Sequence, residues 1–251
     1  SFPLFGYELE DYDTLFAEKL ELLIKLREGE KITWPGGKHT PRIEARGVYP
    51  RPVQDPLPLW IAIGGTPQSA ARAGVYGLPL ALAIIGGEPA RFAPFFDIYR
   101  KAARQFGHDP DKLATSINVH GFVGEDGKRA ADIFFPAQKA VMDQLGRERG
   151  WGPQSRAQFD AGIGPEGAQF VGSPAQIVDK ILSLREDLGF DRVTIQMAIG
   201  VNVPAEMRRA IEVLSTKVAS ELRKMGQAAP LTGMCAASGR VMASLSSCDS
   251  C

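Results

Sequence analysis

The chain has 251 residues, of which 44% are hydrophobic, and its 29 basic side chains balance its 29 acidic ones. A chain of this length buries a sizeable core and forms one or two domains. Balanced charge gives no attraction to nucleic acid or to an anionic membrane surface, and no apolar run approaches the roughly 20 residues that span a bilayer. We therefore expect an ordinary globular protein with neither nucleic-acid nor membrane partners.

Cysteine usage indicates the compartment. The three cysteines are Cys235, Cys248 and Cys251, so the first 234 residues contain none and need no disulfide framework. Residues 1–13 carry acidic residues and lack the basic start of a signal peptide. We expect a cytoplasmic protein.

The first part of the chain predicts a helix followed by a long irregular segment. Helix signals begin at Asp11 or Asp13, an apolar stripe follows, and Gly29 ends the helix. Residues 30–58 are rich in proline, which excludes a central strand or helix and allows turns and edge pairing. An insertion this long is more often functional or interface-forming than idle.

From residue 59 onward, apolar strands alternate with helices. The predicted strands are residues 59–63, 78–85, 115–123 and 192–199. The predicted helices start near residues 66, 89, 128, 173 and 204, and the last ends near residue 224. Residues 150–172, rich in Gly and Gln, are interpreted as a mobile loop. The alternation predicts an α/β fold with a parallel sheet and right-handed crossovers.

The turn after the first of these strands is the most informative stretch. Gly64 and Gly65 allow close approach to the backbone, Thr66 is a good N-cap, and Pro67 suits the first helical position. The N–H groups of the helix start can bind an anion, and the hydroxyls of Thr66 and Ser69 point the same way. Two interpretations stay open: a phosphate cradle, or an ordinary tight turn between strand and helix.

Few other residues suggest chemistry. The helix start at Ser173 is either a rival anion site or a plain N-cap. His120 and Gln196, each on a predicted strand, either line a site or serve structural hydrogen bonds, and His39 and His108 are interpreted as surface residues. The sequence has no metal-ligand spacing, nucleophile elbow or kinase-type glycine loop, so the catalytic residues stay unknown.

The last 27 residues differ in character from the rest. Residues 225–251 are rich in Ala, Ser, Gly and Cys and show no periodic apolar face. Cys248 and Cys251 have the spacing of a redox pair or half a zinc site, but they lie outside any βαβ context. We expect a disordered tail beyond a domain of residues 1–224.

Several segments, in order and at the right spacing, resemble the bacterial luciferase-like flavin-dependent monooxygenase family. The main ones are VYPRPVQDPLPLWIAIGGTPQSAARA (48–73), GLPLALAIIGG (77–87) and NVHGFV (118–123). Residues 171–181 and 210–224 add support, and the resemblance extends over residues 1–224.

The resemblance implies a (β/α)8 barrel of the TIM type that binds FMN, or alternatively F420, at the carboxyl ends of its strands. Family members use reduced flavin and oxygen to oxidise a small organic substrate, the flavin being reduced by NAD(P)H or a partner reductase, and F420 members transfer hydride. The family turn that contacts the flavin phosphate corresponds to Gly64, Gly65, Thr66 and Ser69.

The resemblance also implies a truncation. If residues 59–63 are the fifth barrel strand, the chain holds only strands five to eight, with open edges and several Ile and Leu side chains facing water. We expect a homo-oligomer or pairing with a missing half-barrel. A non-catalytic half-barrel that acts through such pairing, and a different phosphate-binding barrel enzyme, remain the alternatives to a flavin-dependent oxidoreductase.

Overall fold

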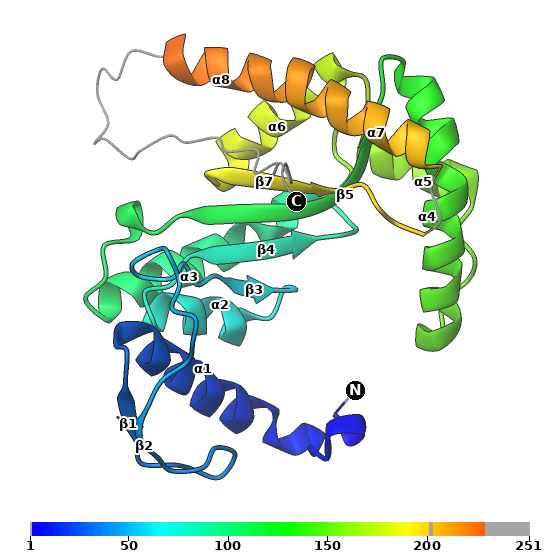
Figure 1. Cartoon of the computed structure of the whole chain (residues 1–251). Helices are drawn as coiled ribbons and strands as arrows, with labels where there is room; N and C mark the ends of the chain where they lie inside the picture. Colours follow the sequence, from blue (N-terminus) through cyan, green and yellow to red (C-terminus); the bar gives the residue numbers. More distant parts are fainter. Residues whose placement is uncertain (1, 201–202, 229–251) are drawn as a thin grey trace. The chain divides into compact units, whose positions relative to one another are not determined.

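The computed structural model describes residues 2–200 and 203–228, and these belong to two compact units, Ser1–Leu59 and Trp60–Cys251 (Figure 1). The final helix, α8 (Ala219–Ala228), continues past the predicted end at residue 224. The three cysteines and the rest of the predicted tail lie outside the described residues.

The first unit is a helix followed by a small antiparallel hairpin. Two 3-10 turns, Pro3–Phe5 and Leu9–Asp11, precede α1 (Tyr12–Glu28), and β1 (Ile32–Trp34) then pairs with β2 (Ile43–Arg46). The helix confirms the expectation from the apolar stripe, and the hairpin is the edge pairing that a proline-rich segment permits.

The second unit contains a parallel sheet, and each of the four predicted strands is present in it. Its strands are β3 (Ile61–Ile63), β4 (Leu80–Ile84), β5 (Thr115–Val123), β6 (Phe170–Gly172) and β7 (Arg192–Gln196). β3, β4 and β5 are neighbours in that order, and β7 lies on the other side of β5 (Figure 1). β7 pairs with residues 116–120 of β5, and β6 pairs with residues 121–123. Gly121 starts the part of β5 that pairs with β6.

Helices connect these strands, as the alternation predicts. They are α2 (Pro67–Val75), the 3-10 turn Pro89–Phe92 with α3 (Ala93–Gln105), the 3-10 turn Pro110–Lys112, α4 (Gly127–Arg149), α5 (Arg156–Ile163), α6 (Pro174–Leu188) and α7 (Pro204–Val213). A π-helical turn, Leu214–Val218, joins α7 to α8 inside the predicted final helix. There the hydroxyl of Thr216 donates to the carbonyl of Glu212 at 2.7 Å.

The expectation of a loop over residues 150–172 is wrong. Helix α5 and strand β6 lie within it. Ser155 and Gln158 form a capping box: the Ser155 hydroxyl accepts from the Gln158 N–H at 3.2 Å, and the Gln158 side chain accepts from the Ser155 N–H at 2.8 Å. Phe159 then anchors the helix, since it is fully buried and its ring centroid lies 5.0 Å from that of Phe135.

The two faces of the sheet differ sharply. One, the buried face, carries Ile, Leu and Val side chains that are at most 4% exposed, namely Ile61, Ile63, Leu80, Leu82, Ile84, Ile117 and Val119. The other, which we call the open face, carries the alternate residues: Ala62, Ala81, Ala83, Ser116, Asn118, His120, Arg192, Thr194 and Gln196. The expectation that several Ile and Leu side chains of strands β3 and β4 face water is therefore wrong. Ile85, 50% exposed, is the exception.

Within the described chain the sheet is open at both sides. β3 pairs only with β4, and β7 pairs only with β5, so each has one edge without a described partner strand. The parallel α/β architecture agrees with the predicted fold class.

Candidate functional site

The turn between β3 and α2 has the predicted position and a different hydrogen-bond pattern. Gly65 has a φ of +105°, a value that L side chains rarely adopt. Thr66 occupies the N-cap position, but its side chain makes no capping bond among the described residues. Instead, the Thr66 hydroxyl donates to the Ser69 hydroxyl at 2.7 Å. The structure therefore brings these two predicted hydroxyls together at the start of α2.

A second glycine pair lies beside the first. Gly86 and Gly87 follow β4, the parallel neighbour of β3, so both pairs lie at the carboxyl edge of the sheet. A Cβ built on Gly64, Gly86 or Gly87 would meet no described atom within 4 Å, whereas one on Gly65 would lie 3.5 Å from the Phe92 ring. A ligand can therefore approach the backbone at Gly64 and at the second pair, while Gly65 serves the geometry of the turn.

The same end of the open face carries polar side chains in two layers. Strand register pairs Asn118 with Thr194 and His120 with Gln196. His120 is half-buried, its Nδ1 is buried and has no hydrogen-bond partner among the described residues, and burial lowers the pKa of His120 below the ordinary value. His120 and Gln196 were recognised singly in the sequence, Asn118 and Thr194 were not, and only the register of two strands reveals the cluster.

The opposite end of the open face is closed by an aromatic contact. The Arg192 guanidinium lies over the Trp60 ring, 4.9 Å from its centroid. Trp60 lies directly before β3 and Arg192 begins β7, so β4 and β5 lie between them, and the small side chains of Ala81 and Ser116 share the layer of Arg192. Strands are spaced about 4.8 Å apart, so two long side chains can meet across the layer only because the residues beneath them are small.

The helix start at Ser173 is a plain N-cap rather than an anion site. The Ser173 hydroxyl accepts from the Gln176 N–H at 3.4 Å, and the Gln176 side chain accepts from the Ser173 N–H at 2.8 Å. Both groups that an anion would need are thus satisfied within the helix.

A cavity of about 750 Å³ lies among the helices, lined by residues of α4, α5 and α6. Lys180 borders it, but the Lys180 ammonium is buried and donates to the carbonyls of Gly164 at 2.7 Å and Gln169 at 2.8 Å. Burial lowers the pKa of Lys180 to about 8. This lysine holds the chain that leads into β6 and is not available to a ligand.

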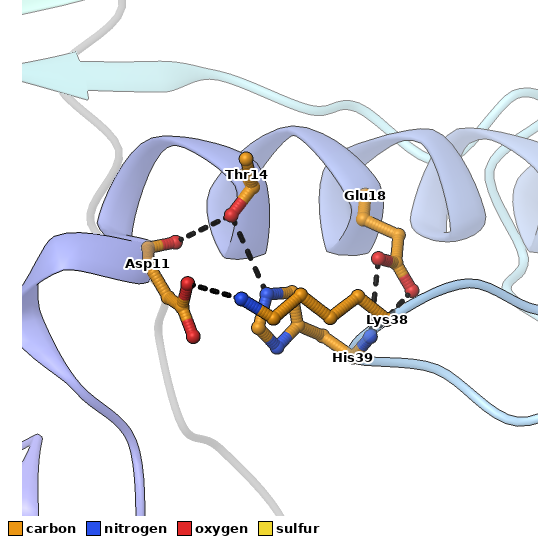
Figure 2. A network of polar contacts seen from close by, with 5 residues as sticks. All are labelled: Asp11, Thr14, Glu18, Lys38 and His39. Atoms are coloured by element: carbon orange, nitrogen blue, oxygen red, sulfur yellow. Dashed lines mark hydrogen bonds and ion pairs between the residues drawn. The ribbon is translucent and has the colours of Figure 1, made fainter.

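In the first unit, a polar network joins the hairpin to α1 (Figure 2). Asp11 pairs with Lys38 at 2.5 Å, and the Glu18 carboxylate accepts from the His39 N–H at 3.0 and 3.1 Å. Hydrogen bonds from Lys38 and from Thr40, respectively, hold the pKa values of Asp11 and Glu18 below the ordinary ones. His39 is half-buried in this network, and its contacts there serve the structure of the first unit.

The described residues contain no group of three or more His, Cys, Asp or Glu side chains that could hold a metal ion. Among them, no helix is long and apolar enough to cross a membrane.

Comparison with known proteins places this geometry in context. The family model described as luciferase-like monooxygenase matches residues 1–192. No curated protein matches the chain. Among solved structures, monooxygenase RslO1 from Streptomyces bottropensis is 20% identical with a TM-score of 0.69, the match covering 88% of this chain and 65% of that one.

Two other solved structures contain different cofactors. The oxygenating constituent of 3,6-diketocamphane monooxygenase from Pseudomonas putida, in complex with FMN, is 19% identical, with a TM-score of 0.57 over 82% of this chain and 62% of that one. An F420-dependent secondary alcohol dehydrogenase, in complex with an F420-acetone adduct, is 18% identical with a TM-score of 0.57, and the match covers 80% of this chain and 60% of that one. The chain thus spans 60 to 65% of the length of these three neighbours, which share its fold.

Proposed function

Because the chain belongs to the luciferase-like monooxygenase family, we propose that it binds FMN, or alternatively F420, at the carboxyl edge of its sheet and acts as an oxidoreductase on a small organic substrate. The observation that carries the proposal is the open backbone at Gly64, next to the paired hydroxyls of Thr66 and Ser69. Solved structures of the same fold contain each of these cofactors.

The residues of this turn fit a phosphate group. α2 begins with Pro67, which has no N–H, and the Ser69 and Ala70 N–H groups donate to the Thr66 carbonyl at 3.1 and 3.3 Å. The Gln68 N–H in this first turn has no partner among the described residues. Such a helix start favours an anion, and the two hydroxyls can turn from each other to donate to phosphate oxygens. Gly64 leaves room for the anion, and the positive φ of Gly65 sets the direction in which the backbone leaves the turn toward α2.

FMN and F420 both carry a phosphate, so this turn accommodates either. When bound, the cofactor would supply the redox chemistry, with oxygen as co-substrate in the FMN case, and NAD(P)H or a partner reductase would supply electrons. The chain would contribute phosphate binding at the turn and a substrate-facing surface on the open face.

The test is cofactor titration of a matched pair of variants. Gly64 and Gly152 both lack a positive φ, and a Cβ on either meets no described atom within 4 Å. We expect Gly64→Val to raise the dissociation constant of FMN, followed by flavin fluorescence, about tenfold or more, and Gly152→Val to leave it unchanged. Equal affinity in both variants would place the phosphate elsewhere, and failure of the wild-type chain to bind either FMN or F420 would refute the proposal.

One observation favours a second candidate, a half-barrel that acts by association. β3 and β7 each present an edge without a described partner strand, and such edges are templates for pairing with another chain. The remaining alternative is a different phosphate-binding barrel enzyme. Competition of FMN with inorganic phosphate and with a sugar phosphate distinguishes it from a flavin enzyme, because a sugar-phosphate enzyme would bind the sugar phosphate more tightly than FMN.

A further inference from the structure

We propose that His120 and Gln196 form a substrate-orienting pair that binds an uncharged organic molecule through its carbonyl oxygen. The inference deepens the proposed function and rests on it for the reaction that the pair would serve. The binding itself can be measured without a cofactor.

The pair is built by strand register. His120 lies near the carboxyl end of β5 and Gln196 at the end of β7, directly opposite in the parallel ladder. Asn118 and Thr194 form the next layer on the same face. Because neighbouring strands lie about 4.8 Å apart, side chains that share a layer can contact one small molecule.

These polar groups lack partners in the described structure. The side chains of Asn118, Thr194 and Gln196 make no hydrogen bond to any described residue, and the Nδ1 of His120 is buried without one. A buried polar atom without a partner costs free energy, so the unpaired Nδ1 restricts which tautomer His120 adopts. The opposite face of the same strand is closed by Ile117 and Val119, each at most 1% exposed. A molecule bound on the open face would hydrogen-bond the unpartnered groups that face it, and the buried Nδ1 would stay unpaired.

The chemistry of the pair selects a neutral carbonyl. Burial keeps the His120 imidazole neutral near pH 7 by lowering its pKa. An unpaired nitrogen lone pair costs less than an unpaired N–H, so we assign the proton to Nε2, which is neither buried nor bonded among the described residues. His120 thus presents a donor to the open face, and the Gln196 amide adds a second.

The rest of the open face sets the character of the ligand. The positions that form this face include no Asp or Glu, and its one cation, Arg192, lies over the Trp60 ring. Ala81 and Ala83, beside the polar layers, leave room for an apolar body. The face therefore suits an uncharged molecule with an apolar part and one hydrogen-bond acceptor.

The experiment is a titration of the full chain, with isotope-labelled histidine, by acetophenone. Toluene lacks the carbonyl and benzoate carries a charge, so they serve as comparison ligands. We expect acetophenone to shift the His120 Nε2 resonance saturably, toluene to leave it unmoved, and benzoate to bind more weakly. Assignment comes from the signal that disappears in His120→Phe.

Variants separate the pair from its surroundings. Gln196→Leu changes an exposed side chain and should weaken acetophenone binding, followed by the His120 resonance, about tenfold, which corresponds to the loss of one hydrogen bond. His108→Gln is the control, since that histidine bonds the Val75 carbonyl at 3.0 Å and lies before β5, at the other end of the strand. It should leave acetophenone affinity unchanged. Equal responses to toluene and acetophenone, or wild-type affinity in Gln196→Leu, would overturn the proposal.

A parallel FMN and F420 titration distinguishes the two proposals. If a cofactor binds and acetophenone leaves His120 unmoved, the pair has no such role while the proposed function stands. If neither cofactor binds and acetophenone still shifts His120, the proposed function fails and the assignment of the pair holds.

Discussion

Lys180 makes the stability of the second unit depend on pH in the direction opposite to that of a lysine held in an ion pair, whose pKa is raised on folding. Its ammonium is buried against backbone carbonyls, and burial lowers its pKa to about 8, from an ordinary value of 10.5. Between these two values the unfolded chain keeps the proton that the folded chain has lost. Stability therefore rises with pH across this window, and the contribution is constant below about pH 8 and above about pH 10.5.

The magnitude follows from the same two values. Each pH unit between the folded and unfolded pKa of Lys180 contributes about 1.4 kcal/mol to the free energy of unfolding, so the rise totals roughly 3 to 4 kcal/mol at most. Urea unfolding of the wild-type chain and of Lys180→Met, at several values from about pH 7 to pH 11, isolates this term because other titrations cancel in the difference. The wild-type chain should gain stability relative to the variant as pH rises through the window. A constant difference would show that the carbonyls stabilise the ammonium as well as water does.

Three further predictions concern the turn, the edges and the tail. Gly65→Val should lower the free energy of unfolding by about 1–3 kcal/mol, because φ there is +105°, whereas Gly64→Val should leave the thermal midpoint nearly unchanged. Light scattering during size-exclusion chromatography at micromolar concentration should show association through β3 and β7, and a sharp monomer peak would refute it. Deleting residues 229–251 should leave the midpoint unchanged, since that sequence has no periodic apolar face. A fall of more than a few degrees would show that it packs.

The strands and most helices could be predicted because their signals are local. The apolar runs of β4 and β5 and the proline at the start of α6 act within a few residues. α5 escaped prediction because glycine and glutamine dominate its surroundings, although Ser155 and Gln158 have the capping-box spacing that marks a helix start.

The candidate site likewise has one part with a local sequence signal and one part without. The glycine turn was found in the sequence because strand, turn and N-cap are consecutive. The cluster of His120 and Gln196 was not, because these residues lie far apart in the chain and meet only through the register of β5 and β7. Likewise, an all-apolar strand does not reveal which of its side chains a helix will cover, so the exposure of β3 and β4 was predicted wrongly.

Gly121 determines how closely this site can be assembled. It follows His120 on β5, at the point where pairing passes from β7 to β6. A Cβ at Gly121 would lie 2.7 Å from the Ile195 Cγ2 and would also collide with the carbonyl of Phe170. Even alanine would therefore wedge both strands outward and carry Gln196, the neighbour of Ile195, away from His120. The separation of His120 and Gln196, and with it the space for a ligand between them, thus depends on the absence of a single methyl group on the buried side of the sheet.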